Sequence, residues 1–277
     1  MTSLSQFLAE TAALFEAAGI ESFQADAETL IGFSLGISRG EVQAKAFLEE
    51  EFEASSQLRE MIDRRAKREP LQHLTGVAHF RNLSLAVGPG VFVPRPETES
   101  VVSIALAWLR GVSNAKVLDI GTGSGAIAIA IASEGNLQVD AIEISEEAAS
   151  FTRRNIDANH ARVNLLVGDF REVSLEFGSY DLVISNPPYI PLSAIPIDPE
   201  VRDFDPELAL YGGEDGLDLI REIIEHSHLL LRVGGMLVLE HADGQSDMVC
   251  ELLLPNWQTV RAHSDSTGRL RAVSAVR

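Results

Sequence analysis

Cysteine, positive charge and long apolar runs are all scarce in this sequence of 277 residues. Cys250 is the single cysteine, so the chain can form no internal disulfide bond and no cysteine-based zinc site. Lysine and arginine together number 22 against 41 acidic residues, which gives a formal net charge of −19. Because nucleic-acid phosphates are bound by clustered cations, this balance argues against naked nucleic acid as the main partner, although a local basic face is compatible with it.

The sequence also lacks a segment that could enter a membrane. No run of about 18 apolar residues occurs, and the amino terminus has no basic stretch followed by an apolar core. We therefore expect a soluble, cytoplasmic protein. No metal site is expected, because His226 and His228 are two residues apart and so lie on different faces of a helix. The one concentrated basic run, residues 64–68, fits the solvated end of a helix better than a binding patch.

Three parts follow one another along the chain. Residues 1–70 carry apolar residues at helical spacing and no alternating strand pattern, which predicts a small helical domain. Scaffolding and substrate recognition are equally open as its role. Residues 71–92 predict a connector with a β-hairpin, because apolar and polar residues alternate over 79–87. Residues 93–277 form the third part, in which we expect the chemistry.

From Lys116 onward, short apolar runs alternate with helical patterns, which is typical of a doubly wound parallel sheet. The predicted strands cover 117–120, 138–144, 163–168, 182–185, 236–240, 257–262 and 269–276. The predicted fold class is therefore α/β, a Rossmann-like sheet with a small amino-terminal helical domain and a connecting β-hairpin. Open sheets of this kind bind ligands at the carboxyl ends of their strands, so motifs at those positions matter most.

One such motif, Asn186-Pro187-Pro188-Tyr189, directly follows the strand predicted to end at Ser185. Two successive prolines have fixed φ angles and no N–H groups, so they leave a stiff backbone with exposed carbonyl oxygens. The Asn186 side-chain oxygen and the Pro187 carbonyl can accept both hydrogens of one planar amino group, while Tyr189 covers its flat face. The alternative is a strand exit without chemistry, which the position at a strand's carboxyl end disfavours.

A second motif, Asp-Ile-Gly-Thr-Gly-Ser-Gly over 119–125, lies between the first predicted strand of the sheet and its helix. Its glycines permit a tight turn and let a ligand approach the N–H groups of the helix start. Gly121, Gly123 and Ala126 also satisfy a dinucleotide-binding pattern, with Glu143 near the distance expected of a ribose partner. A hydride-transfer enzyme is the alternative. It has no use for Asn-Pro-Pro-Tyr, whereas the Asp119 carboxylate suits an amino group.

These motifs, with Gly168-Asp169-Phe170 after the third strand, resemble those of the class I S-adenosylmethionine-dependent methyltransferases. The resemblance implies S-adenosylmethionine as cofactor and S-adenosylhomocysteine as product. It puts the glycine-rich turn at the methionine moiety, Glu143 at the ribose hydroxyls, and Asp169 with Phe170 beside the adenine. The cofactor-binding residues that it implies are Asp119, Gly121, Thr122, Gly123, Ser124, Gly125, Glu143, Asp169, Phe170 and Asn186.

The remaining motifs resemble those of the peptide chain release factor N5-glutamine methyltransferases. They cover residues 69–76, 93–99, 202–207, 212–218 and 265–271, and the stretch Val-Pro-Arg-Pro-Glu-Thr-Glu at 93–99 is the most discriminating. This resemblance implies methylation of the side-chain amide nitrogen of glutamine in the Gly-Gly-Gln loop of class 1 release factors. The alternatives are an N-methyltransferase acting on adenine or guanine of nucleic acid, and a binding module without turnover.

An amide nitrogen is a weak nucleophile because its lone pair is delocalised, so methyl transfer needs the nitrogen oriented at the methyl group. Acceptors at Asn186 and Pro187 would hold both N–H bonds and localise electron density on the nitrogen. Asn186, Pro187 and Tyr189 are therefore the predicted catalytic residues. The predicted substrate contacts are these three with Pro188, Arg95 and Glu97. We expect a monomer that binds release factors and makes no direct contact with nucleic acid.

Overall fold

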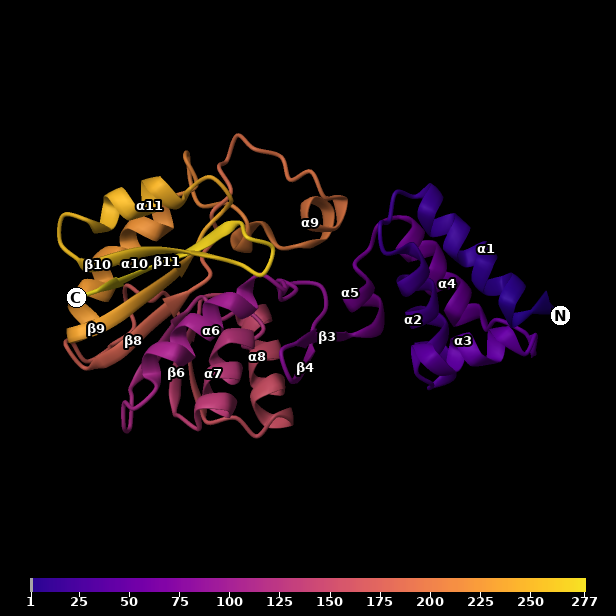
Figure 1. Ribbon diagram of the computed structural model, residues 1–277, viewed down its shortest axis with the longest axis horizontal. Helices are drawn as coiled ribbons and strands as arrows, with labels where there is room; N and C mark the ends of the chain where they lie inside the picture. The colour runs from indigo at the N-terminus through magenta and orange to yellow at the C-terminus, as the bar shows by residue number, and fades with distance from the viewer. Residues whose placement is uncertain (1) are drawn as a thin grey trace. The chain divides into compact units, whose positions relative to one another are not determined.

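The structure is a computed structural model that describes residues 2–277. The chain folds into two compact units (Figure 1). The first comprises the residues up to Val77 together with Pro196–Phe204, and the second comprises Ala78–Ile195 and Asp205–Arg277. The sequence indicated a helical domain and a sheet domain, but it gave no sign that residues 196–204 fold with the first. Among the described residues, no helix is both long enough and apolar enough to cross a bilayer.

The first unit is built from helices whose apolar faces share one core. Phe15, Leu30, Ile31 and Leu58 are fully buried at its centre. Its helices are α1 (Leu4–Ala17), α2 (Phe23–Leu35), α3 (Arg39–Phe47), α4 (Ser56–Ala66), α5 (Leu71–Thr75) and α9 (Pro199–Phe204), and the two-residue strands β1 (Thr2–Ser3) and β2 (Glu51–Phe52) pair beside them. Ser38 and Glu41 start α3 with a reciprocal capping box, which satisfies two N–H groups that a helix start leaves free.

The basic run at 64–68 is only in part the solvated helix end that was expected, since Arg64 and Lys67 are exposed but Arg65 and Arg68 are not. Arg65 is buried, and its guanidinium donates to Asp26 and to Glu200, each over 2.8 Å. Arg68 donates to Glu200 over 2.6 Å and to Asp198 over 3.2 Å. These arginines anchor the segment Pro196–Phe204 within the first unit. The sequence could not show this, because Glu200 lies 135 residues after Arg65.

The second unit contains a seven-stranded sheet in the order β10-β11-β9-β8-β5-β6-β7. Its strands are β5 (Val117–Ile120), β6 (Val139–Glu143), β7 (Val163–Val167), β8 (Tyr180–Ser185), β9 (Leu231–Glu240), β10 (Gln258–Ser264) and β11 (Leu270–Val276). The five strands from β5 to β9 run parallel, and the hairpin of β10 and β11 is antiparallel. The predicted doubly wound α/β fold is confirmed.

Helices cover both faces of this sheet (Figure 1). They are α6 (Thr98–Leu109), α7 (Ala126–Gly135), α8 (Glu146–Ala158), α10 (Asp218–Leu230) and α11 (Ser246–Leu253), with the short 3-10 helix η1 (Glu207–Ala209). The predicted connecting hairpin is formed by β3 (Val77–Phe80) and β4 (Leu83–Ala86). The Asn155 side chain of α8 holds it, accepting from Ala86 N over 2.6 Å and donating to Ala86 O over 3.0 Å.

Successive side chains of a strand point to opposite faces of the sheet. The apolar residues of the strands therefore form one core on each face. In β9, Met236 and Val238 join the core that contains α6 and α7, whereas Leu237 and Leu239 join the core that contains α10 and α11. A residue at the carboxyl end of a strand therefore lies at the rim of one of these two cores. The candidate site is built from such residues.

Most strands differ from the prediction by one or two residues at a boundary, and β9 differs by five. The strand β9 begins at Leu231 rather than at Met236, so Gly234 and Gly235 lie inside it. A Cβ on Gly235 would come within 3.0 Å of the carbonyl oxygens of Arg232 and Tyr180, so the glycine allows a close approach of the backbones. A register shift between Tyr180 and Leu182 accompanies it on β8.

Candidate functional site

The predicted site residues gather at the carboxyl edge of the parallel strands, where β5, β6, β7 and β8 each end in one of the motifs. Asp119 is one residue before the end of β5, Glu143 ends β6, and Asn186 directly follows β8. In the sheet, β5 lies between β6 and β8, so these three elements are neighbours. The edge that the fold assigns to ligands therefore carries the motifs that sequence singled out.

The glycine-rich turn leaves open space beside its backbone. Gly121, Gly123 and Gly125 have φ angles of +73°, +58° and +85°, values that L side chains rarely adopt. A Cβ on Gly121 or Gly123 would meet nothing within 4 Å, so a ligand can reach the main chain there. Gly125 lies closer to its neighbours, since a Cβ there would come within 2.9 Å of the Ile129 side chain and 3.1 Å of the Thr152 side chain.

Asp119 is fully buried below this turn. The Thr122 hydroxyl donates to its Oδ2 over 2.6 Å, whereas its Oδ1 has no hydrogen-bond partner among the described residues. Burial raises the pKa of Asp119 to about 7, and the hydrogen bond from Thr122 opposes this shift. A buried acceptor without a partner is costly, which makes Oδ1 a point where a ligand cation or N–H donor would be stabilised.

Glu143 holds the turn from the neighbouring strand. Its Oε2 accepts from Gly123 N over 2.8 Å, and its Oε1 accepts from Ser145 N over 2.9 Å. Each carboxylate oxygen has a second lone pair, so the side chain can still accept two hydroxyl groups. Ser145 in turn caps α8 by accepting from Ala148 N, which fixes the loop after β6.

Asp169 and Phe170 follow β7, beside Glu143, whose carbonyl accepts from Gly168 N over 2.9 Å. The Asp169 carboxylate is engaged by Arg171, whose hydrogen bond lowers the pKa of Asp169. Phe170 is buried, and its ring packs edge-on against His226 with 5.2 Å between the ring centroids. Phe170 therefore belongs to the core that contains α10 and α11, and it also borders the loop after β7.

Asn186 is half-buried and points its amide nitrogen at α6, where Nδ2 donates to Thr98 Oγ1 over 3.3 Å. Pro187 is buried, and Pro188 and Tyr189 are half-buried. Burial raises the pKa of the Tyr189 phenol above its usual range, with the nearby carboxylates of Glu240 and Glu97 adding to the shift. Because the Nδ2 end of the Asn186 amide contacts Thr98, its oxygen Oδ1 is left to accept from another donor.

The loop 210–218 supports the backbone of the Asn-Pro-Pro-Tyr motif through hydrogen bonds and close contacts. Ile190 N donates to Leu210 O, and Gly212 N donates to Ile190 O, each over 2.9 Å. A Cβ on Gly212 would lie 2.4 Å from Pro188 O, and one on Gly216 would lie 2.3 Å from Tyr189 O. Glycines are therefore required where this loop touches the motif. The sequence flagged the loop as a family motif without giving it this role.

The stretch 93–99 lies next to the same motif. Arg95 donates to Asp205 Oδ2 over 2.6 Å, and its guanidinium lies 4.9 Å from the centre of the Phe92 ring. Glu97 precedes α6, and both residues act electrostatically on Tyr189. The structure thus brings Arg95 and Glu97 together with Tyr189. Arg95 is already engaged by Asp205, so Glu97 has the freer charge.

Thr98, Glu240 and Gln245 also belong to this neighbourhood, and sequence reasoning did not single them out. Thr98 contacts Asn186, Gln245 Nε2 donates to Tyr189 O over 3.0 Å, and Glu240 is buried beside them. Thr98 could have been found inside the 93–99 motif. Glu240 offered one signal, an acid directly after the apolar run 236–239, because buried strands seldom end in an unpaired charge.

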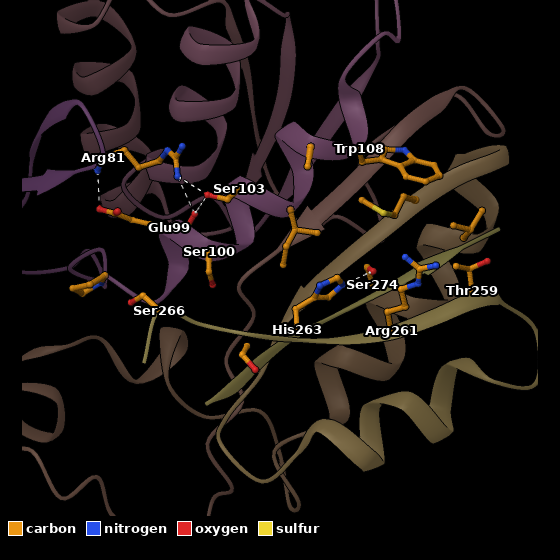
Figure 2. Close-up of a pocket in the computed structure, with 16 residues that line it drawn as sticks. Arg81, Glu99, Ser100, Ser103, Trp108, Thr259, Arg261, His263, Ser266 and Ser274 are labelled. Carbon is orange, nitrogen blue, oxygen red and sulfur yellow. Dashed lines mark hydrogen bonds between the residues drawn. The ribbon is translucent and has the colours of Figure 1, made fainter. Parts of the chain in front are cut away.

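A groove of about 720 Å³ runs along α6 (Figure 2). It begins at Pro96 and continues to Trp108, with Thr259, Arg261 and His263 of β10 opposite. His263 Nε2 and Ser274 Oγ share a hydrogen bond of 2.7 Å in its wall. None of the predicted catalytic or cofactor residues lines it, so the groove is a separate feature of the second unit.

The strand order, the glycine-rich turn and the polar motif after β8 define a Rossmann-like methyltransferase. The sequence model of a family described as "Methyltransferase domain" matches residues 117–195, and that of "PrmC N-terminal domain" matches residues 6–76. A crystal structure of a methyltransferase from Pyrococcus furiosus superposes with a TM-score of 0.53 at 22% identity, covering 71% of this chain and 89% of that one. That likeness concerns the fold.

Curated relatives identify the family. A "Release factor glutamine methyltransferase" of Streptomyces coelicolor is 46% identical, with 93% of this chain and 92% of the relative covered. Proteins of the same name from Bifidobacterium longum and Mycolicibacterium smegmatis are 43% and 42% identical, over 94% and 100% of this chain and 94% and 99% of theirs. The chain belongs to the release factor glutamine methyltransferase family, as the motifs predicted.

Proposed function

We propose that this protein transfers a methyl group from S-adenosylmethionine to the side-chain amide nitrogen of the glutamine in the Gly-Gly-Gln loop of class 1 release factors. The observation that carries the proposal is the contact of Asn186 with Thr98, which joins the Asn-Pro-Pro-Tyr motif to the discriminating stretch 93–99. Family membership supports the same substrate. The names of the relatives do not favour the alternative of a nucleic-acid N-methyltransferase.

The residues at the strand ends fit the cofactor. The buried Asp119 Oδ1 without a partner suits the methionine amino group, the open backbone at Gly121 and Gly123 suits close approach, and Glu143 has lone pairs left for two ribose hydroxyls. Asp169 and Phe170 would border the adenine, as the family resemblance implies. When bound, S-adenosylmethionine supplies an electrophilic methyl group on a sulfonium and leaves as S-adenosylhomocysteine.

The chain's own contribution is to orient a poor nucleophile. Asn186 Oδ1 and the Pro187 carbonyl would accept the two N–H bonds of the substrate amide, so that the nitrogen lone pair is directed at the methyl group. Tyr189 would cover the plane of the amide and exclude water. As the new N–C bond forms, one N–H proton becomes acidic and leaves the nitrogen for water or a neighbouring acceptor.

Many compounds present a planar amino group that Asn186 and Pro187 could hold. Specificity for glutamine would therefore come from the residues that surround the bound amide. Glycines before the target glutamine would let a loop enter a narrow site, since they have no Cβ. Glu97 is half-buried beside Tyr189 and is a better candidate for contact with the partner than Arg95, which Asp205 holds. We assign recognition of the folded factor to the helical unit and chemistry to the sheet unit, in a monomeric enzyme.

The test compares methyl transfer from labelled S-adenosylmethionine to four acceptors: the intact release factor, its Gln→Asn variant, the isolated loop peptide and duplex DNA. We expect rapid labelling of the intact factor at the glutamine alone. The peptide should react poorly, because ordering a free chain costs about 1–2 kcal/mol per residue. Faster labelling of DNA than of the factor would reverse the assignment of substrate.

A further inference from the structure

Glu240 is a buried acid that the proposed chemistry does not use. It ends β9 with an exposure of 1%, and its Oε2 has no hydrogen-bond partner among residues 2–277. A carboxyl group in such a place costs several kcal/mol if it is ionised, so it is rarely retained for packing alone. Its neighbours indicate what it does instead.

The sheet register places Glu240 directly beside Asn186. β8 and β9 run parallel with Ser185 opposite Leu239, so Asn186, which directly follows β8, lies beside Glu240, the last residue of β9. Both continue the face that packs on α6, because they follow Ile184 and Val238 at a spacing of two. Thr98, the first residue of α6, contacts Asn186 and is itself buried.

This group fixes one end of the Asn186 amide. Nδ2 donates to Thr98 Oγ1 over 3.3 Å, and both Thr98 and Asn186 act on the Glu240 carboxyl group by opposing the rise in its pKa. An ionised carboxylate accepts hydrogen bonds and cannot donate one, so it selects the NH₂ end of the amide and rejects the oxygen end. With Nδ2 turned towards Glu240 and Thr98, Oδ1 must face the opposite way, towards the substrate.

We propose that Glu240 is a positioning residue, which holds the Asn186 amide in the orientation that presents Oδ1 to the substrate –NH₂ group. This inference rests on the proposed function. Without Glu240 the amide can turn over, and an Nδ2–H group facing the substrate would repel the N–H bonds that Oδ1 should accept. The loss would therefore fall on kcat and leave binding of the cofactor unchanged.

The charges around Glu240 predict a pH signature. Glu97 before α6, Arg271 of β11 and Tyr189 after β8 act electrostatically on it or feel its charge, and His241 follows it on its own strand. Burial is the largest cause that raises the pKa of Glu240 to about 8. Deprotonation converts a group that can also donate into one that only accepts, so kcat should rise as the pH increases through this value.

The experiment measures kcat and KM for the intact release factor with the wild type, Glu240→Gln and Glu240→Leu, from pH 6.5 to 9.5. Glu240→Leu should lower kcat by about 10²-fold, the scale of a misplaced catalytic group, with KM and cofactor affinity unchanged. Glu240→Gln keeps an acceptor but cannot titrate, so it should retain more activity and lose the rise near pH 8. A Glu240→Gln profile that rises like that of the wild type would overturn the proposal.

A double-mutant cycle separates positioning from a general structural role. If Glu240 acts through Asn186, Glu240→Leu should cost almost nothing further once Asn186 is alanine, whereas independent effects would multiply. The control is Asp181→Asn, a buried acid at the opposite end of β8 that accepts from Lys116 N over 2.8 Å; it should change stability without changing kcat. If the fold-losses in kcat of the two single substitutions multiply in the double variant, the positioning role of Glu240 is refuted. An inactive wild type would instead refute the proposed function.

Discussion

The side-chain amide of Gln245 donates a hydrogen bond of 3.0 Å to the main-chain carbonyl of Tyr189. The same carbonyl lies against Gly216, where a Cβ would be 2.3 Å from the oxygen. Two segments that follow the motif by 27 and 56 residues therefore set the position of its last residue. The rigidity of Asn-Pro-Pro-Tyr thus depends on this support as well as on its prolines.

Gly216→Ala should move the motif and lower kcat. The added methyl group can only be accommodated if the Tyr189 backbone shifts, and a displacement of about 1 Å near the reacting atoms can cost about 10²-fold. Steady-state kinetics with the release factor measures the loss. Gly178→Ala is the matched control, because Gly178 also has a positive φ, +66°, but a Cβ there meets nothing within 4 Å. Equal losses in both variants would mean that backbone strain alone is responsible.

Asn186→Ala should leave the fold and the cofactor affinity intact and lower turnover by about 10²-fold or more, because one acceptor of the substrate N–H bonds is lost. Single-turnover labelling of the release factor measures this step. Asn164→Ala, which removes an exposed hydrogen bond of 2.9 Å between β7 and β6, should show wild-type rates. Unchanged turnover in Asn186→Ala would remove this residue from the reaction.

Glu143→Ala should weaken cofactor binding by about 1.5–3 kcal/mol, the usual contribution of a charged hydrogen-bond acceptor. Titration calorimetry with S-adenosylmethionine gives the affinity. Because Glu143 also holds Gly123 N, part of the loss reflects a looser turn, and Glu143→Gln should recover part of it. Glu146→Ala, an exposed acid three residues along, provides the control. An affinity equal to that of the wild type would place the ribose elsewhere.

Glu240→Gln should stabilise the protein increasingly as the pH rises. Burial raises the pKa of Glu240 from 4.5 to about 8, so between these values the folded state keeps a proton that the unfolded state releases. Stability of the wild type therefore falls with increasing pH in this window, by at most about 1.4 kcal/mol per pH unit from this group, and glutamine removes that fall. Urea unfolding at pH 5 and pH 8 measures the difference, and a pH-independent difference would contradict it.

The expected effects of Glu240→Gln on stability and on activity have opposite signs, which distinguishes a functional role of Glu240 from a structural one. A residue kept for stability would make the protein weaker when it is replaced, whereas Glu240→Gln is expected to be more stable and less active. Such a trade is typical of functional sites, where an unfavourable arrangement persists because activity needs it.

The sequence predicted what depends on neighbours along the chain. The turn at 119–125, the Asn-Pro-Pro-Tyr motif and the acid at 143 are local patterns, and the alternation of strands with helices placed all of them at one edge of a parallel sheet. The sheet order brought Asp119, Glu143 and Asn186 onto adjacent strands, in agreement with the predicted fold class.

The sequence could not predict contacts that depend on register and packing across the fold. Glu240 follows Asn186 by 54 residues, and only the pairing of β8 with β9 shows that they are neighbours. Arg65 was assigned to a solvated surface because its acidic partners, Asp26 and Glu200, are distant in sequence. Secondary-structure propensity depends on a residue's own segment, whereas the roles of Glu240 and Arg65 depend on contacts with other segments.

The segment Pro196–Phe204 has a consequence for the way the protein is made. The chain passes between the two units at residues 77, 195 and 204, so the helical unit is assembled from two separate stretches. During synthesis its helices leave the ribosome first, yet the carboxylate of Glu200 that Arg65 and Arg68 bind arrives more than a hundred residues later. The unit that is translated first is therefore completed late, after β5 to β8, four strands of the other unit's sheet, have been synthesised.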